Sequence, residues 1–108
     1  MDFKQVESFY WHDGILTNFP FSLSDIPSVL ISVKLYENQN AVDRKSVTLQ
    51  FNDVEHTSFS VNSFELNDNQ SAGNISNAYC KKILDSNRFQ FFMYLVDGYI
   101  SFAFKTAL

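Results

Sequence analysis

The fold is decided by FQFFMYLVDGYISFAF, residues 89–104. Two apolar runs flank Asp97-Gly98, a dipeptide typical of two-residue hairpin turns in which both residues have positive φ. Such a loop pairs Val96 with Tyr99 and Leu95 with Ile100. In this register one face is entirely apolar, with Phe89, Phe91, Met93, Leu95, Ile100, Phe102 and Phe104. Turn and alternation agree, so we predict a β-hairpin that buries this face.

The same alternation extends toward the N-terminus. Residues 28–36 place Val29, Ile31, Val33 and Leu35 on one face, and Val47, Leu49 and Phe51 follow with the same parity. Pro20 limits the run 15–19 to a sheet edge or a strand end, because proline cannot donate a ladder hydrogen bond. At Phe64 and Leu66 the apolar positions change from odd to even numbers, which predicts a bulge or strand break near residues 62–63.

Helical spacing is confined to two short segments. Phe3, Val6 and Tyr10 predict a short N-terminal helix. Residues 75–85 fit both periods, and we favour a strand over 75–81, with a second helix near 75–85 as the alternative. The predicted fold is mainly β, with about six or seven antiparallel strands in a twisted sheet, sandwich or partial barrel. The helical alternative makes the fold α+β.

Length and composition bound the class of protein. The 108 residues suit a single domain, 1–108. No run approaches the ~20 apolar residues of a membrane helix, and the first residues lack the pattern of a signal peptide. One cysteine, Cys80, excludes an internal disulfide. We therefore expect a cytoplasmic protein that does not bind membranes. A formal charge of −4 without a basic stripe argues against nucleic-acid binding.

No motif for catalysis or for a cofactor is present. His12 and His56 lack metal-ligand spacing, Cys80 has no nearby histidine, and the three glycines form no phosphate loop. We therefore expect no metal, no cofactor and no enzymatic activity. A small enzyme using a pair of carboxylates is the remaining catalytic alternative, because 12 acidic residues offer many pairs.

The net charge comes from one segment. Residues 46–80 contain no Lys or Arg, and their acidic residues are Asp53, Glu55, Glu65 and Asp68. An acidic patch of this kind can steer a basic partner and accelerate association. We predict these four residues as the partner-binding site, against the alternative of an ordinary solvated face.

For three aromatic residues the sequence does not decide between burial and exposure. Trp11 lies between the helix and the first strand, and we expect it in the core rather than at a binding surface. Phe92 and Tyr94 fall on the mixed face of the hairpin. They are either covered by other elements or form an exposed aromatic contact surface.

The opening Ser8-Phe9-Tyr10-Trp11-His12-Asp13-Gly14-Ile15 resembles that of bacterial polymorphic-toxin immunity proteins, closest to the immunity protein 50 family. The outline continues in the strand 29–35, in Leu49-x-Phe51-x-x-Val54 and in the aromatic strands 89–104. The resemblance implies a non-catalytic protein that binds and neutralises a cognate toxin, for example a basic nuclease domain. The family supplies no catalytic residues. We read Trp11, His12 and Asp13 as structural, with Asp13 turning the chain before Gly14.

Two binding functions are thus compared. The first is an immunity protein that forms a one-to-one complex with a toxin and is itself a monomer or weak dimer. The alternative is a carbohydrate- or small-ligand-binding β-sandwich, in which exposed Trp11, Phe92 or Tyr94 stacks on the ligand.

Overall fold

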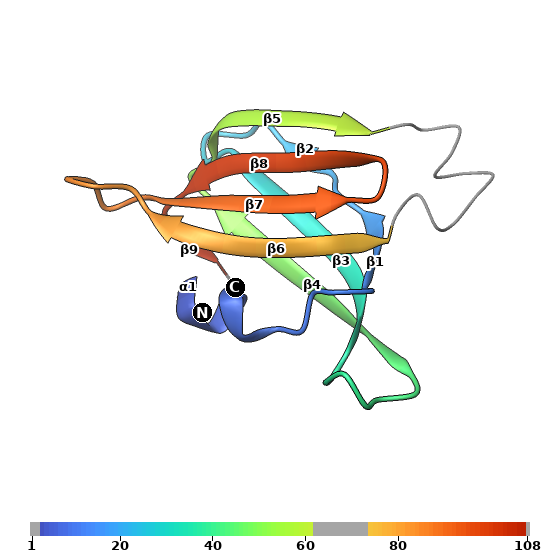
Figure 1. The fold of residues 1–108 in the computed structure, drawn as a ribbon. Coiled ribbons are helices and arrows are strands. Elements are labelled where there is room, and N and C mark those ends of the chain that lie inside the picture. Colours follow the sequence, from blue (N-terminus) through green and yellow to red (C-terminus); the bar gives the residue numbers. More distant parts are fainter. Residues whose placement is uncertain (1–2, 62–73, 108) are drawn as a thin grey trace.

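The structure is a computed structural model that describes residues 3–61 and 74–107. This part of the chain forms one short helix and nine strands, arranged in two antiparallel sheets. Seven of the nine strands span four residues or more. The predicted mainly-β, sandwich-like class is confirmed, and the sheets do not close into a barrel (Figure 1). Over the described ranges, the one helix is too short to cross a membrane.

Sheet A contains two long central strands, β3 and β4, with short strands on either side. Its strands are β1 (Ile15–Asn18), β2 (Phe21–Ser22), β3 (Ser28–Tyr36), β4 (Arg44–Asn52) and β9 (Thr106–Ala107). Their order is β1-β3-β4-β9, and β2 also pairs with β3. Pro20 lies between β1 and β2 at this edge, as its missing N–H predicts.

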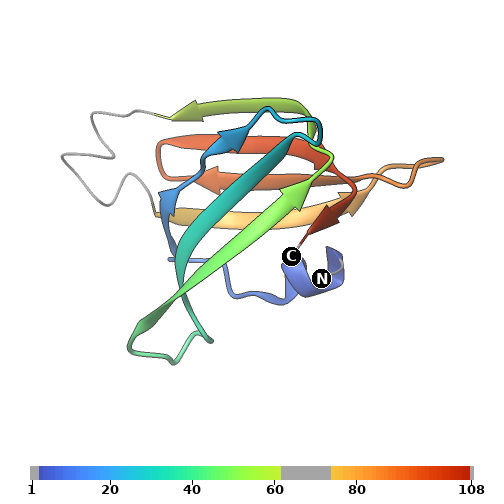
Figure 2. The same cartoon turned by 180° about the vertical axis from the view of Figure 1, so that it is seen from behind.

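Sheet B is formed by the second half of the chain. Its strands are β5 (Glu55–Val61), β6 (Ile75–Lys82), β7 (Phe89–Leu95) and β8 (Gly98–Phe104), in the order β5-β8-β7-β6. Seen from behind, β3 and β4 run diagonally across the strands of sheet B (Figure 2).

The two sheets meet at a corner where both strands of a pair bend together. β4 passes into β5 through Asp53 and Val54, and β8 passes into β9 through Lys105. At the bend the Lys105 N–H donates to the Asn52 carbonyl oxygen over 3.1 Å. On the other side a single bridge joins Ile15 to Asn74 and links β1 to the start of β6.

The core lies between the sheets and follows the predicted alternation. Val29, Ile31, Val33 and Leu35 are buried, as expected from β3. At the centre, the centroid of the Phe51 ring lies 4.8–5.0 Å from the ring centroids of Phe91, Phe102 and Phe104. These are edge-to-face and tilted arrangements, which aromatic quadrupoles favour.

Helix α1 (Phe3–Ser8) closes one end of the core beside β6. Val6 is fully buried, and Trp11 is 3% exposed. The Trp11 indole N–H donates to the Val6 carbonyl oxygen over 2.9 Å. The predicted N-terminal helix and the predicted core position of Trp11 are both confirmed.

The alternative of a second helix near residues 75–85 is wrong. Residues Ile75–Lys82 form β6 and pair with β7. Ile75, Ala78 and Cys80 point into the core, with an irregularity after Ile75 that changes the phase. Ile75, Tyr79 and Ile83 have helical spacing, but Tyr79 lies on the outward face of β6 and Ile83 follows its end.

The predicted hairpin exists, but its predicted register is wrong by two residues. Leu95 pairs with Gly98 and Phe91 with Phe102, so the loop residues are Val96 and Asp97. Gly98 opens β8 with φ of 142°, and an added Cβ there would lie 2.1 Å from the Ser60 carbonyl oxygen. Because a shift of two preserves parity, the predicted apolar face still points inward.

A bulge occurs earlier in β5 than the predicted phase change. Its register shifts between Glu55 and Ser58, and His56 has a positive φ of 54°. The predicted break near residues 62–63 lies outside the described residues.

Candidate functional site

The structure describes two of the four acidic residues that were predicted to bind a partner. Glu65 and Asp68 lie outside the described residues. Asp53 and Glu55 lie at the corner between β4 and β5, and Asp53 has a positive φ of 55°.

Arg88 binds this corner from the β6–β7 loop. Its Nε lies 2.6 Å from Glu55 Oε1, and its Nη1 donates to the Asp53 carbonyl oxygen. The Arg88 side chain is 22% exposed and that of Glu55 is 45% exposed. The Glu55 charge is therefore compensated by a partly buried arginine. Arg88 thus pairs with the Glu55 carboxylate, whereas it contacts Asp53 only through the backbone carbonyl oxygen.

The Trp11–Gly14 segment is a tight turn, as predicted. Asp13 has φ of 64°, and the Gly14 N–H donates to the Trp11 carbonyl oxygen over 3.0 Å. Aspartate tolerates this conformation better than most residues. The Asp13 N–H also donates to the Ile75 carbonyl oxygen, so the turn is fixed to the start of β6.

The groups considered for catalysis are dispersed in the described part of the chain. His12 lies in the N-terminal turn and His56 in β5. Residues 3–61 and 74–107 contain no cluster of three metal-ligating side chains. Cys80 is buried, and burial, with a smaller effect of Glu7, raises the pKa of its thiol to about 12. The thiol therefore stays protonated near neutral pH and is a poor nucleophile.

The outward face of sheet B brings together a different set of residues. The pairing register places three rows of four side chains on this face, and we call them the tyrosine face. Its members are Glu55, Ser58 and Ser60 of β5, Tyr99, Ser101 and Ala103 of β8, Gln90, Phe92 and Tyr94 of β7, and Asn77, Tyr79 and Lys81 of β6.

Aromatic rings occupy the middle of the tyrosine face. The Tyr79 and Phe92 rings stack with centroids 5.0 Å apart, and Phe92 and Tyr94 are nearly parallel, at 3° and 6.4 Å. Tyr94 and Tyr99 oppose each other across β7 and β8, and they are 42% and 39% exposed. Phe92 and Tyr94 thus belong to an accessible aromatic surface.

Uncharged polar groups surround these rings. The Ser58 and Tyr99 hydroxyls are 3.0 Å apart, and the Gln90 amide donates to the Ser101 hydroxyl over 2.6 Å. A side-chain hydrogen bond with Tyr79 is the main cause that raises the pKa of Tyr94 above its usual value. The hydroxyls are therefore oriented by their neighbours before any ligand arrives.

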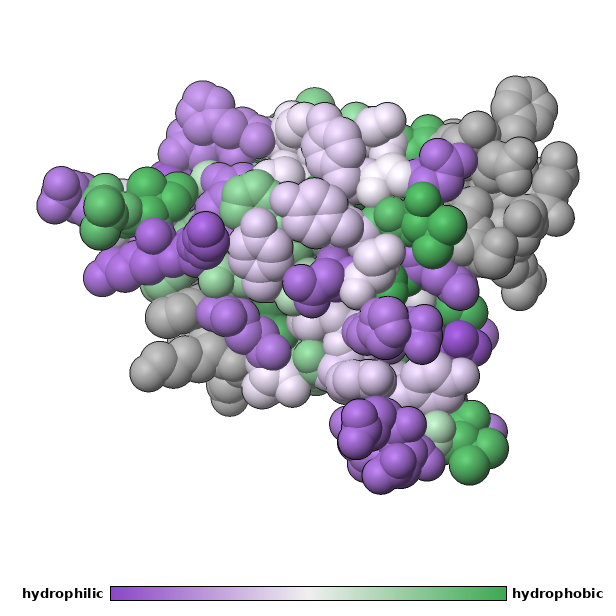
Figure 3. Space-filling view, in the orientation of Figure 1, coloured by the Kyte–Doolittle hydropathy of each residue, from purple (hydrophilic) through white to green (hydrophobic). Residues whose placement is uncertain are grey.

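Formal charges on the tyrosine face are confined to its corners. Glu55 and Lys81 lie at opposite ends of one row, separated by Ala103 and Gln90. Ser58, Phe92, Tyr94, Tyr99, Ile100 and Ser101 line a hollow of about 290 Å³. In the space-filling view the middle of this face is mostly pale, with intermediate hydropathy (Figure 3).

Sequence reasoning identified Phe92 and Tyr94 but missed Tyr79 and Tyr99. The hairpin shifted by two residues put Val96 opposite Tyr99, which hid the pairing of Tyr94 with Tyr99. Tyr79 joins them only through the pairing of β6 with β7. No known family model, curated protein or solved structure matches the chain. The resemblance to immunity proteins therefore depends on the sequence motifs alone.

Proposed function

We propose that this protein is a non-catalytic binding module that holds a protein partner against the tyrosine face. The observation that carries the proposal is the composition of this face: four aromatic rings among hydroxyl and amide groups, with charges only at two corners. Together with the opening motif, it supports an immunity protein whose partner is a bacterial toxin domain.

The chemistry of the tyrosine face suits protein recognition. Tyrosine offers a large contact area and a hydrogen-bonding group at low cost in side-chain entropy, and Ser, Asn and Gln adapt to varied polar partners. Interface centres are generally depleted in charged residues, because an unpaired buried charge is costly. Tyr94 and Tyr99 are exposed rings on the two inner strands of sheet B, so we propose them as the main contributors to the binding energy.

The face is compatible with a basic toxin. Arginine and lysine side chains bind favourably over aromatic rings, and Lys81 already lies 5.9 Å from the centroid of the Tyr79 ring. We propose that the complex forms in the cytoplasm, where the single cysteine remains a thiol.

Co-expression with the product of the adjacent upstream gene tests the proposal. We expect the host to survive and the two proteins to co-elute as a one-to-one complex. Toxicity without rescue, and no complex, would overturn the immunity function.

The tyrosine face is tested separately within that complex. Tyr94→Ala combined with Tyr99→Ala should raise the dissociation constant at least about tenfold, as expected for central aromatic residues. Tyr36→Ala, on the outward side of sheet A, is the matched control and should leave affinity unchanged. If the unaltered protein, the double variant and the Tyr36→Ala control bind the partner with equal affinity, the tyrosine face is not part of the interface.

The predicted acidic residues remain part of the proposal as contributors to association rate. Glu65→Gln with Asp68→Asn should slow association and reduce its salt dependence. Glu37→Gln, a substitution at an exposed ion pair with Lys45, is the control. Because the Glu55 carboxylate is paired with Arg88, we expect substitution of Glu55 to act through stability as well as through charge. Arg88 binds Asp53 through its backbone carbonyl oxygen, so substitution of Asp53 should act mainly through charge.

The second candidate function is binding of a small ligand on the same face. The nearly parallel Phe92 and Tyr94 rings beside a hollow of about 290 Å³ favour stacking against the apolar C–H face of a sugar ring. Trp11 is buried and cannot take part in stacking. Saturable shifts of the Tyr94 and Tyr99 amide resonances with a glycan, without a protein complex, would favour this function.

A further inference from the structure

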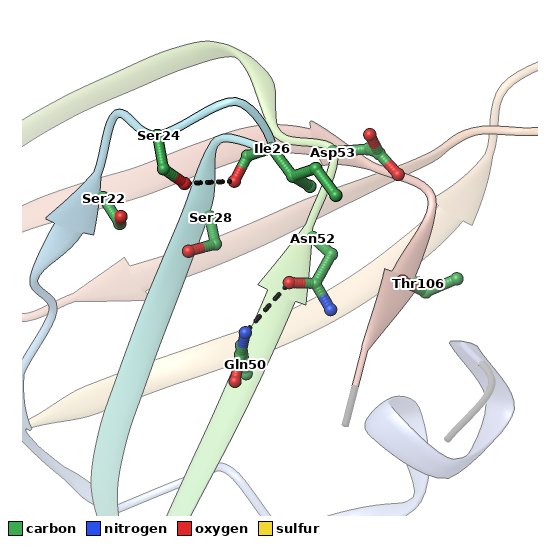
Figure 4. A pocket seen from close by; sticks show the side chains of 8 residues that line it. All are labelled: Ser22, Ser24, Ile26, Ser28, Gln50, Asn52, Asp53 and Thr106. Carbon is green, nitrogen blue, oxygen red and sulfur yellow. Dashed lines mark hydrogen bonds between the residues drawn. The ribbon is translucent and has the colours of Figure 1, made fainter.

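A second site of different chemistry lies on the outward face of sheet A. Four strands contribute one polar side chain each to a single row in register: Ser22, Ser28, Asn52 and Thr106. The row crosses β2, β3, β4 and β9 beside the corner of the sandwich (Figure 4). It forms the floor of a groove of about 580 Å³, within the range of small-molecule sites.

The surrounding residues give this groove walls and a rim. The loop between β2 and β3 passes along the upper side and brings Ser24 and Ile26 over the groove, while Gln50 continues the floor along β4. The Ser24 hydroxyl donates to the Ile26 carbonyl oxygen over 3.1 Å, and the Gln50 amide donates to Asn52 Oδ1 over 3.0 Å. These two hydrogen bonds hold Ser24 and Ile26 in place in the loop, and Gln50 and Asn52 in place on the floor.

Among the described residues that line the groove, Asp53 supplies the single formal charge. Its positive φ of 55° and the bond from Arg88 to its carbonyl oxygen fix its backbone at the rim. The guanidinium of Arg88 contacts the Asp53 carbonyl oxygen and the Glu55 carboxylate. The Asp53 carboxylate is not paired with it. The described part of the chain contributes no Lys or Arg to the lining, so the groove does not suit a phosphate or another anion.

We infer that this groove binds a saccharide. Hydroxyls and side-chain amides both donate and accept hydrogen bonds, and so do the hydroxyls of a sugar ring. Ile26 offers the one aliphatic contact for the C–H groups of the ring. A largely apolar ligand would leave the polar floor without water or partners, which is costly. The site lies on the opposite sheet from the tyrosine face and does not depend on the proposed protein partner.

The charge of Asp53 also predicts a preference within saccharides. A protonated amino sugar should bind more tightly than the neutral sugar, and a uronic acid more weakly, because the carboxylate attracts the first and repels the second. Asp53→Asn keeps a residue that tolerates positive φ and removes the charge. This substitution should abolish the preference for the protonated amino sugar over the uronic acid.

The test is an amide-resonance titration of the full chain with glucose, glucosamine, glucuronate and their β-linked disaccharides. We expect saturable shifts at Gln50, Asn52 and Thr106, with affinity on the order of millimolar for so open a site. Gln50→Ala should weaken binding about fivefold, as loss of roughly one hydrogen bond implies. Ser46→Ala, an exposed position of β4 outside the groove, is the matched control.

Three results would overturn the inference. The first is the absence of saturable shifts in the folded protein with any of these sugars. The second is saturation confined to Tyr94 and Tyr99, which would move sugar binding to the tyrosine face. The third is a Gln50→Ala protein that binds the sugar as tightly as the Ser46→Ala control, which would exclude the groove as the site.

Discussion

Arg88 Nε lies 2.6 Å from Glu55 Oε1, and this ion pair joins the β6–β7 loop to the strand that begins after the corner. The same guanidinium donates to the carbonyl oxygen of Asp53, one residue beyond the end of β4. One side chain therefore holds both sides of the bend at which the chain passes from sheet A to sheet B.

Replacing Arg88 should destabilise the fold. Arg88→Ala leaves the Asp53 carbonyl and the Glu55 carboxylate without this partner, and we expect a loss of about 1–3 kcal/mol of unfolding free energy. The control Lys45→Ala breaks an exposed ion pair with Glu37 and should cost less than about 1 kcal/mol. Urea denaturation measures both, and equal losses would contradict the assigned role of Arg88.

Substitution of Gly98 should be costly for a steric reason. In Gly98→Ala the new Cβ meets the backbone carbonyl of Ser60 at 2.1 Å, and the residue must keep φ of 142°. We expect a loss of at least about 2 kcal/mol. Gly14→Ala is the comparison, because its closest contact is the movable end of Leu35 at 2.5 Å. Thermal unfolding should show the larger decrease in Tm for Gly98→Ala. A larger decrease for Gly14→Ala would contradict the steric role of Gly98.

The Cys80 thiol should make stability fall at alkaline pH. Its pKa of about 12 in the folded protein exceeds the ordinary value of 9.0, so the unfolded chain loses this proton first. The folded state then binds more protons, and the free energy of unfolding decreases as pH rises from 9 to about 12. Cys80→Ala should show a shallower decrease over this interval. Identical slopes of the two proteins would count against the raised pKa.

Trp11 should behave as a buried fluorophore. Its ring lies 5.8 Å from that of Phe91, and its N–H is bonded to the Val6 carbonyl oxygen. We expect blue-shifted emission that acrylamide quenches weakly in the folded state. Trp11→Phe removes the bond that holds α1 and should cost about 1–3 kcal/mol in urea denaturation. Quenching as strong as that of free tryptophan would place the ring in solvent.

The sequence predicted the elements that depend on local alternation. The bounds of β3, its inward face and the apolar face of the β7–β8 hairpin follow from residues two apart in the chain. The exact pairing of the hairpin did not follow, because Asp97-Gly98 is a turn signal whose position was set by contact between Gly98 and β5. That contact joins residues far apart in the sequence.

The candidate site was harder to predict than the fold. The tyrosine face needs the register of three strand pairs, and bulges interrupt two of them, in β5 and after Ile75. The groove on sheet A needs β2 and β9, which are two residues long and carry no periodic signal. The charge pattern pointed to Asp53 and Glu55 as part of a partner-binding site, but it could not show that Arg88 would pair with Glu55.

The bulge at His56 has a consequence for solubility. β5 is an outer strand of sheet B, and an outer strand can recruit another chain through its free backbone groups. Within the described residues, the shifted register and the positive φ of His56 reduce the regular edge to Ser58–Val61. So short an edge gives an incoming strand few hydrogen bonds. The irregularity thus acts against aggregation by sheet extension, at the strand that borders the tyrosine face.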